Sequence, residues 1–159
     1  MWPLLPNAQW RTTSVDERRE LLRAEIDAGP PPGLVAYIDG APAGWVRVGP
    51  RSAQRRILRS RAVGASPEPV DAEDVWGVTC FSVRREHRRK GLNAAFLDAA
   101  ADYARDRGAR VLEAYPIDTT VGKTSTNALY VGSLSTFLAA GFEERARPTA
   151  TRVLVSRTL

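Results

Sequence analysis

Basic residues are concentrated between positions 84 and 91, and they are the side chains of this chain best suited to bind a ligand. Five of the eight residues there are Arg or Lys, and the stretch ends at Gly91. A helix is expected directly after Gly91, and a helix N-terminus repels cations because its dipole is positive there. A bound polyanion would reverse that repulsion, because free N–H groups and arginines would both contact it. The stretch therefore predicts a pyrophosphate-binding turn, with a solvated basic turn as the alternative.

Two elements would hold this turn in place. Residues 75–83 form a short apolar run rich in β-forming residues, which predicts a strand. Apolar side chains at Leu92, Phe96, Ala99 and Tyr103 recur at helical spacing, which predicts a long helix after the turn. The pattern is therefore strand, basic turn and helix.

The spacing Arg88-x-x-Gly91-x-Asn93 at this place resembles the acetyl-coenzyme A (acetyl-CoA) signature of the GNAT superfamily of N-acetyltransferases, Q/R-x-x-G-x-G/A. Asn93 departs from it, because the signature has Gly or Ala at that position. The resemblance implies that acetyl-CoA is the cosubstrate. It also implies that the binding residues are Phe81, Ser82 and Val83 along the pantetheine arm, and Arg88, Arg89, Lys90, Gly91, Leu92 and Asn93 around the pyrophosphate.

The downstream sequence extends the resemblance. The stretch from Tyr130 to Gly141-Phe142 is similar to the superfamily's later helix and its Gly-Phe ending, so the resemblance covers residues 33–147. It implies an α+β (mixed α/β), GNAT-like fold with a central, mixed and mostly antiparallel sheet of about six to seven strands and about four helices. The length and the lack of a linker predict that residues 1–159 form a single acetyltransferase domain.

Local patterns predict the remaining elements. Ser14-x-x-Glu17 is a capping box, which predicts a helix that ends at Gly29 before three prolines. The other expectations, in chain order, are an edge strand or loose arm through Trp10, a hairpin of strands 34–38 and 44–48 around Asp39-Gly40, a short basic helix within 50–61, a strand over 110–115 parallel to 75–83, a loop over 117–127, a helix over 129–140, and an antiparallel pair over 142–145 and 152–156.

Acetyl transfer to an amine requires a neutral amine, a polarised thioester carbonyl and a thiolate that can leave. The resemblance implies that backbone N–H groups beside residues 81–83 polarise the carbonyl, and that the amine attacks directly in a ternary complex. Glu113 is the candidate general base, because strand alternation places it among apolar neighbours that would favour proton uptake. The alternative for Glu113 is a carboxylate paired with an arginine, and Asp74 and Asp118 are the reserve candidates.

The general acid must differ from that of many superfamily members, which carry a tyrosine where this chain has Phe137. Tyr130 and Ser135 are the candidates to protonate the thiolate, with packing as the alternative role of Tyr130. A thiol pKa of about 8.5 would also let the thiolate leave unaided. Cys80 is predicted to pack in the core, because no basic partner is evident beside it. His87 is the single histidine, so no metal site is expected.

The composition limits the classes of binding partner that are expected for this chain. No apolar run is long enough to cross a membrane, so no membrane partner and a cytoplasmic location are expected. The net charge of +5 attracts polyanions non-specifically, but no nucleic-acid-binding signature is present, and nucleic acid is a minor alternative. The expected partner is a small-molecule amine, and the chain is expected to be a monomer or a homodimer.

Two functions remain open from the sequence. The first is an N-acetyltransferase that acts on a primary amine, and the second is a non-catalytic acyl-CoA-binding protein of the same fold, which Asn93 and Phe137 allow. Residues 49–74 and 117–127, together with the N-terminal helix, would line the acceptor site. The arginines within 50–61 are predicted to lie on a solvated surface, with a substrate-facing position as the alternative.

Overall fold

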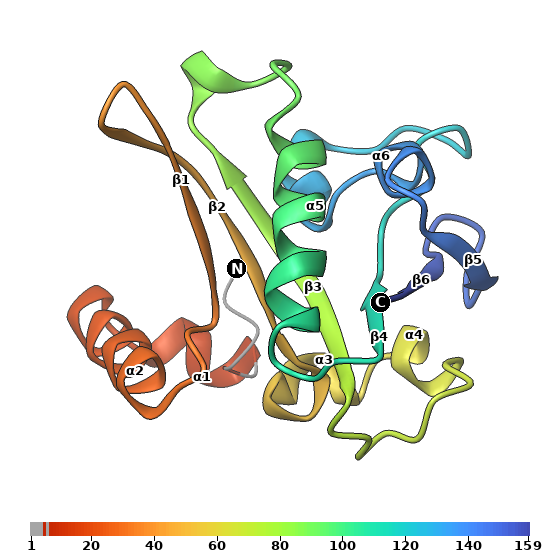
Figure 1. Cartoon of the computed structure of the whole chain (residues 1–159), viewed down its shortest axis with the longest axis horizontal. Coiled ribbons are helices and arrows are strands. Elements are labelled where there is room, and N and C mark those ends of the chain that lie inside the picture. Colours follow the sequence, from red (N-terminus) through yellow and green to blue (C-terminus); the bar gives the residue numbers. More distant parts are fainter. Residues whose placement is uncertain (1–4, 6) are drawn as a thin grey trace.

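The structure is a computed structural model that describes residue 5 and residues 7–159. Over these residues six strands form one sheet, in the order β1-β2-β3-β4-β6-β5. All neighbouring strands are antiparallel except β3 and β4, which confirms the mixed, mostly antiparallel sheet expected from the sequence (Figure 1). The strands are β1 Gly33–Ile38, β2 Ala41–Pro50, β3 Val75–Val83, β4 Val111–Ala114, β5 Glu143–Ala146 and β6 Leu154–Thr158.

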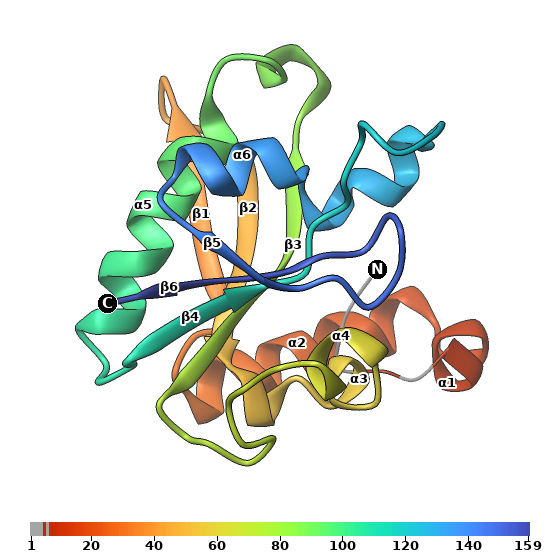
Figure 2. The ribbon, with the colours of Figure 1, turned by 90° about the vertical axis from the view of Figure 1, so that its right-hand side faces the viewer.

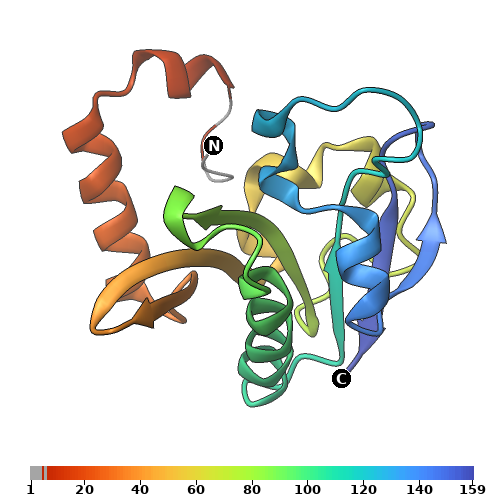
Figure 3. The same ribbon diagram turned by 90° about the horizontal axis from the view of Figure 1, so that it is seen from above.

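Helices cover both faces of the sheet. Helices α5 and α6 lie on one side, and the short helices α3 and α4 lie on the other (Figure 3). Among the described residues no helix is both long and apolar enough to cross a lipid bilayer. The α-helices are α1 Asn7–Thr12, α2 Val15–Ala28, α3 Arg55–Leu58, α4 Arg61–Gly64, α5 Leu92–Arg105 and α6 Leu134–Ala139, and the 3₁₀ helices are η1 Arg51–Ala53, η2 Arg85–His87 and η3 Thr126–Val131.

The main core lies between α5, α6 and the sheet. Of the face predicted for α5, Phe96 is buried there, Leu92 and Tyr103 are half-buried, and Ala99 is exposed; the buried face includes Leu97 instead. Phe137 of α6 is fully buried, with its ring centroid 5.9 Å from that of Phe81 and 5.2 Å from that of Phe142. Each such side chain contributes about 1.5–3 kcal/mol through burial, so this core fixes α5 and α6 against the sheet.

The parallel pairing of β3 with β4 is short. It runs from Val75 opposite Val111 to Val78 opposite Ala114, which confirms the expected parallel neighbours. Strand β3 then continues to Val83 beside β2 alone, while β4 and β6 run in a different direction (Figure 2). The sheet therefore opens along one side of β3 after Val78.

Strand β3 also carries a bulge at the point where the sheet opens. Arg47 pairs with Cys80 and the next residue, Val48, pairs with Val78, so Thr79 is the extra residue on β3. A bulge re-aims the side chains around it and marks places where pairing ends. Thr79 therefore faces the side of α3 rather than the core under α5.

The N-terminal segment is helical. The predicted capping box is confirmed: the Ser14 hydroxyl accepts a bond from the Glu17 N–H at 3.2 Å, and the Glu17 carboxylate accepts the Ser14 N–H at 2.7 Å. The buried Arg47 of β2 pairs with Glu25 and so anchors α2. The expected edge strand or arm through Trp10 is wrong for residues 7–10, which begin α1; residues 1–4 and 6 lie outside the described residues.

Two expected helices are broken into shorter ones. The helix predicted over 129–140 consists of η3 and α6, separated at Gly132. Gly132 has φ +84°, and a Cβ there would lie 2.7 Å from the Phe137 ring, so the chain turns where only glycine fits. The basic helix expected within 50–61 is likewise divided into η1, α3 and the start of α4.

Candidate functional site

The basic turn after β3 has a backbone shaped by two left-handed residues. Arg89 has φ +61° and Gly91 has φ +79°. Gly91 caps the N-terminus of α5, and the Arg88 Nε donates to the Val83 carbonyl at 3.1 Å, which ties the turn to the end of β3. Alternation between right-handed and left-handed residues directs successive N–H groups into a concavity, as in anion-binding nests.

Five consecutive N–H groups of this turn have no acceptor. Within the described part of the chain, no protein atom accepts a hydrogen bond from the backbone N–H groups of residues 89–93. Their basic side chains are exposed, and the single acidic residue of the turn, Glu86, lies 4.0 Å from Arg84. Free donors and unneutralised cations are the groups that a pyrophosphate requires, so the turn fits the phosphates of coenzyme A.

Gly91 is required by its conformation rather than by crowding. A Cβ at Gly91 would meet nothing within 4 Å among the residues that the structure describes. A left-handed φ costs an ordinary residue about 1–2 kcal/mol, and a β-branched residue more. Asn93 lies half-buried in the first turn of α5, where its own backbone N–H is one of the five free donors.

The strand segment expected to hold the pantetheine arm lies beside the opening in the sheet. Phe81 is buried against α5 and α6, Ser82 is exposed, and Val83 is half-buried. Beyond Val78 the β4 side of β3 has no strand partner in the described chain. Backbone groups on that side are therefore available to a ligand that lies along β3.

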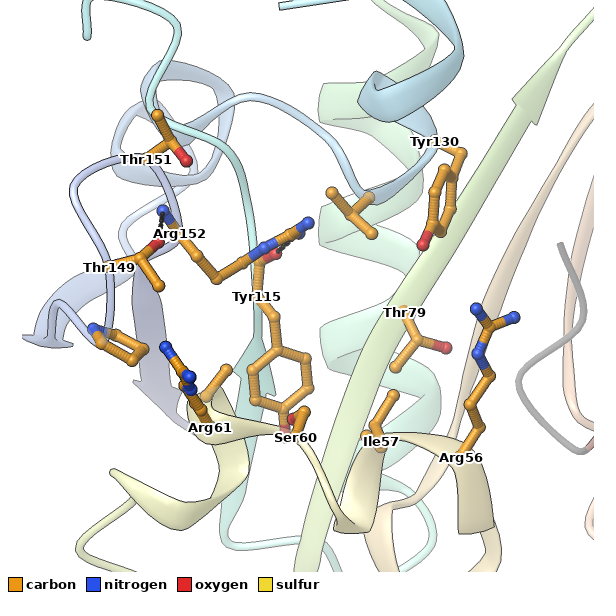
Figure 4. Close-up of a pocket in the computed structure, with 13 residues that line it drawn as sticks. Arg56, Ile57, Ser60, Arg61, Thr79, Tyr115, Tyr130, Thr149, Thr151 and Arg152 are labelled. Atoms are coloured by element: carbon orange, nitrogen blue, oxygen red, sulfur yellow. Dashed lines mark hydrogen bonds between the residues drawn. The ribbon is translucent and has the colours of Figure 1, made fainter. Parts of the chain in front are cut away.

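A pocket lies next to the place where β3 and β4 separate. It is on the face of the sheet that carries α3 and α4. It has a volume of about 410 Å³, within the range of small-molecule sites (Figure 4). The lining residues come from α3, α4, β3, η3 and the segments that flank β4 and β6: Arg56, Ile57, Ser60, Arg61, Ala62, Thr79, Tyr115, Tyr130, Val131, Pro148, Thr149, Thr151 and Arg152. We call it the arginine pocket, after its three arginines.

The bulge residue Thr79 lines the arginine pocket and is held by a buried amide. Its hydroxyl donates to Oε1 of Gln54 at 2.5 Å. Nε2 of Gln54 donates to the carbonyls of Gly77 at 2.8 Å and Gly49 at 3.1 Å, so Gln54 links η1 to β2 and β3. Because each of these polar groups has a partner, the bulge is a fixed feature of the pocket wall.

Glu113 lies behind the arginine pocket and does not line it. Both Glu113 and Arg51 have no exposed surface, and Nη1 of Arg51 contacts the Glu113 carboxylate at 2.9 Å. The hydroxyls of Ser66 and Tyr115 donate to the same carboxylate, the second at 2.8 Å. We call these four residues the Glu113 cluster. The expectation of apolar neighbours for Glu113 is wrong, because its side chain is surrounded by hydrogen-bond donors.

Tyr115 separates the Glu113 cluster from the arginine pocket. Its ring lines the pocket, while its hydroxyl donates to Glu113. Burial first, and then the nearby carboxylate of Glu113, raise the pKa of Tyr115 well above its ordinary value. Tyr115 is therefore protonated across the physiological range and closes the cluster on the pocket side.

The two candidate general acids lie in different places. Tyr130 lines the arginine pocket and points its hydroxyl into it (Figure 4). Ser135 is exposed on α6, 3.2 Å from the Ser133 hydroxyl, and is not among the lining residues. Phe137, which replaces the usual tyrosine, is in the core. Of these side chains, Tyr130 is the one that a ligand in the pocket would meet.

The reserve carboxylates are also paired. Asp74 accepts from Arg110 at 2.9 Å, and Asp118 accepts from Arg147 at 2.8 Å. Bonds from Thr120 first, and then the bond from Arg147, lower the pKa of Asp118. Cys80 is 5% exposed and burial raises the pKa of its thiol, which confirms its place in the core.

Sequence reasoning missed the three pocket arginines as a group. Arg56 and Arg61 were predicted to lie on a solvated surface, with a substrate-facing position as the alternative, and Arg152 to lie in a strand. A signal was present, because residues 40–67 contain six arginines and no Asp or Glu. A stretch of that length cannot neutralise its own arginines, so each must either pair with an acid from elsewhere, as Arg47 and Arg51 do, or stay unpaired.

Comparison with known proteins shows the same fold in solved acetyltransferases. The GNAT domain of S. lividans PAT is 24% identical, with a TM-score of 0.54, and the match covers 80% of this chain and 60% of that one. The ribosomal-protein-alanine N-acetyltransferase from Brucella melitensis is 18% identical, with a TM-score of 0.58 and coverage of 92% and 80%. The N-acetyltransferase from Staphylococcus aureus Mu50 is 15% identical, with a TM-score of 0.60 and coverage of 92% and 78%.

The sequence itself matches a family model. No curated protein matches the chain. The model described as "Acetyltransferase (GNAT) family" matches residues 2–132, which is more than half of the chain and includes β3, the basic turn and α5. The chain belongs to the GNAT acetyltransferase family.

Proposed function

We propose that the chain is an acetyl-CoA-dependent N-acetyltransferase that acts on the primary amine of a small molecule. One observation carries the proposal: the opened side of β3 connects the turn with five free N–H groups to the arginine pocket. A cofactor held at the turn and an acceptor held in the pocket would meet along β3. Membership of the family supports acyl transfer as the general chemistry.

Bound acetyl-CoA would supply an activated thioester, and the residues of this chain would bind and orient it. The N–H groups of residues 89–93 and the side chains of Arg88, Arg89 and Lys90 would hold the pyrophosphate. The free backbone groups of Phe81, Ser82 and Val83 would lie along the arm and polarise the carbonyl. These assignments keep all the cofactor-binding residues expected from the sequence.

The reaction would be a direct attack within a ternary complex. The amine nitrogen forms a bond to the acetyl carbon as the C–S bond breaks, and the thiolate leaves with the cofactor. Tyr130 is the residue that we assign to protonate the thiolate, because its hydroxyl points into the pocket (Figure 4). Cys80 takes no part, because its thiol is buried.

We further propose that solvent water takes the proton of the amine. Within the described chain the lining of the arginine pocket contains no carboxylate, and Glu113 reaches it only through the Tyr115 hydroxyl. The carboxylate of Glu113 already accepts bonds from Arg51, Ser66 and Tyr115. Glu113 therefore stays a candidate base only through Tyr115, and substitution of that hydroxyl tests it.

A thiol-release assay tests the proposed function. Purified protein with acetyl-CoA and a panel of amines, amino acids and amine-bearing phosphates should release free thiol in step with an acetylated product. The second candidate function, an acyl-CoA-binding protein without turnover, is favoured by the absence of a hydroxyl at Phe137. It would show cofactor binding by calorimetry and no thiol release with any amine.

Gly91→Val tests the cofactor site, with Gly40→Val as its matched control. Gly40 also has a positive φ, +77°, and open space at its Cβ, but it lies in the β1–β2 hairpin. Both variants should lose stability by about 2 kcal/mol or more, because valine is β-branched and a left-handed φ costs such a residue more than an ordinary one. Gly91→Val alone should weaken binding of coenzyme A, tenfold or more by calorimetry. Equal affinity in the two variants would remove the turn from the cofactor site.

A further inference from the structure

The arginine pocket collects positive charge without any acid to balance it. Arg56, Arg61 and Arg152 line it from three different elements of the fold (Figure 4). No Asp or Glu is among the described residues of its lining. The residues outside the description, 1–4 and 6, include no acidic side chain either. The pocket therefore has three guanidinium groups and no protein carboxylate.

Arg152 is the most constrained of the three. Its side chain is half-buried, and Nη1 donates to the Tyr115 carbonyl at 2.6 Å, which fixes the guanidinium (Figure 4). Nε and Nη2 make no hydrogen bond to the described residues, and they are not among the buried atoms without a partner, so both are accessible on a residue that lines the pocket. Because the side chain is half-buried, desolvation lowers the pKa of this guanidinium.

Two carboxylates of the segment around the lining residue Tyr115 are already paired with other arginines. Glu113 pairs with Arg51 at 2.9 Å, and Asp118 pairs with Arg147 at 2.8 Å. Over residues 7–159 the three pocket arginines have no ion-pair partner. Ten other arginines of the described chain pair with carboxylates, including the two that are fully or almost fully buried, Arg47 and Arg51.

A partly buried cation without a partner lowers stability, because its desolvation is not offset. An anionic group in the pocket would offset it, and an arginine fork binds carboxylate or phosphate through two parallel hydrogen bonds. The free Nε and Nη2 of Arg152 are adjacent nitrogens, so they can make such a pair of bonds. Arg56 and Arg61 add charge around the same volume.

We infer that the acceptor of this acetyltransferase is an amine that also carries an acid group, a carboxylate or a phosphate, and that Arg152 binds this group. The inference rests on the proposed function and names the substrate class of the same site. The volume of about 410 Å³ suits a molecule of amino-acid size. Arg152 is a specificity-determining residue in this assignment, and Arg56 and Arg61 strengthen the field.

The same charges favour the form of the amine that reacts. Nearby cations disfavour an ammonium group, so an amine bound among three guanidinium groups loses its proton more readily than it does in water. The acid group supplies affinity, and the surrounding cations promote the neutral amine. This explains how a pocket without a carboxylate could work with solvent water as proton acceptor. Polyamines, which carry only positive charge, should be excluded.

Matched pairs of acceptors test this inference. Each pair has the same amine and differs in the acid group: alanine against alaninamide, β-alanine against propylamine, and ethanolamine phosphate against ethanolamine. The acid-bearing member of at least one pair should have a kcat/KM at least tenfold higher in the thiol-release assay. Its advantage should shrink as salt is raised from about 0.05 to 0.5 M, since salt screens the attraction.

Variants of the pocket arginines test whether the preference for acid-bearing acceptors comes from this pocket. Arg152→Gln should lower kcat/KM for the acid-bearing acceptor by about 10–100-fold, mainly through KM, and should lower that of its neutral partner by a much smaller factor. Arg152→Lys should retain only part of the wild-type kcat/KM for the acid-bearing acceptor, because an ammonium group lacks the two parallel N–H donors of a guanidinium. Arg56→Gln should have a smaller effect of the same kind. Arg55→Gln is the matched control, because Arg55 is exposed on the same helix and is not in the lining.

The outcomes separate this inference from the proposed function. Turnover of neutral or polycationic amines that equals or exceeds turnover of the acids, with no effect of Arg152→Gln, would overturn the inference and leave the acetyltransferase intact. If no amine releases thiol, the proposed function fails. Calorimetry of the acids and their neutral partners then decides the inference: binding of the acids that Arg152→Gln abolishes supports an anion site, and equal or absent binding removes it.

Discussion

The Glu113 cluster and the arginine pocket lie on either side of the Tyr115 ring, and they treat arginine in opposite ways. In the cluster, Arg51 is fully buried and meets the carboxylate of Glu113 together with two hydroxyls. In the pocket, Arg152 is half-buried and its free nitrogens meet no protein acceptor among residues 7–159. Arg51, in the cluster, is neutralised by a carboxylate, whereas Arg152, in the pocket, has no carboxylate partner among the described residues.

This difference separates support from recognition. A buried ion pair with satisfied hydrogen bonds has no capacity left for a ligand, so the Glu113 cluster holds η1, β4 and the loop around Ser66 together. A charge that the protein leaves unpaired is available to whatever enters the pocket. Glu113, the general base predicted from the sequence, therefore lies in a cluster whose contacts support the fold, and its catalytic role stays a prediction.

Arg51→Met should give the largest effect and tests the structural side of the comparison. It leaves the Glu113 carboxylate buried without its cation, which typically costs about 3–5 kcal/mol. Urea denaturation should show this loss in the free energy of unfolding. Arg56→Met is the matched control, because it removes an unpaired pocket arginine and should change stability by less than about 0.5 kcal/mol. Equal losses in the two variants would erase the distinction.

Tyr115→Phe tests the boundary between the two regions. It removes one hydrogen bond to a charged carboxylate, so a loss of about 1.5–3 kcal/mol in stability is expected. Turnover of a folded sample should change less than about threefold if Glu113 is structural. A loss of a hundredfold or more, with cofactor affinity intact, would instead show that the hydroxyl relays a proton to Glu113.

Asp118→Asn should give the smallest effect on stability. It extends the comparison to a second ion pair, that of Asp118 with Arg147. The lowered pKa of Asp118 means that its carboxylate stabilises the fold above pH 3.8, the ordinary value, and that this contribution is lost as pH falls through the lower folded value. The difference in melting temperature between wild type and Asp118→Asn should therefore be constant near neutrality and shrink below pH 3.8. A difference that is independent of pH would mean that the charge of Asp118 contributes nothing.

Much of the fold could be predicted from local sequence patterns. The capping box at Ser14, the hairpin at Asp39-Gly40, the buried strand and the helix after Gly91 each depend on residues within a few positions of one another, and each is present. The parallel neighbour of β3 followed from the order strand, helix, strand. Such signals are short-range, and one sequence suffices to show them.

The site was harder to predict, because its contacts join distant residues. The partners of Glu113 include Arg51 and Ser66, which lie 62 and 47 positions away. The sequence shows that arginines are abundant but not which of them meets an acid. The basic turn between β3 and α5 is a local pattern and could be predicted, whereas the arginine pocket required the fold. The helical start of the chain was missed for a related reason, since its two prolines obscured the helix that begins at Asn7.

The short pairing of β3 with β4 has a consequence for the order in which the molecule assembles. Strands β1, β2 and β3 form a meander of neighbours in sequence, while β4, β5 and β6 come from the last third of the chain. Contacts close in sequence form early, and pairing across a crossover helix must wait for the longer loop to close. The arginine pocket takes Thr79 from the first group and Arg152 from the second. Neither half supplies the whole lining, so the pocket exists only after both halves have packed together.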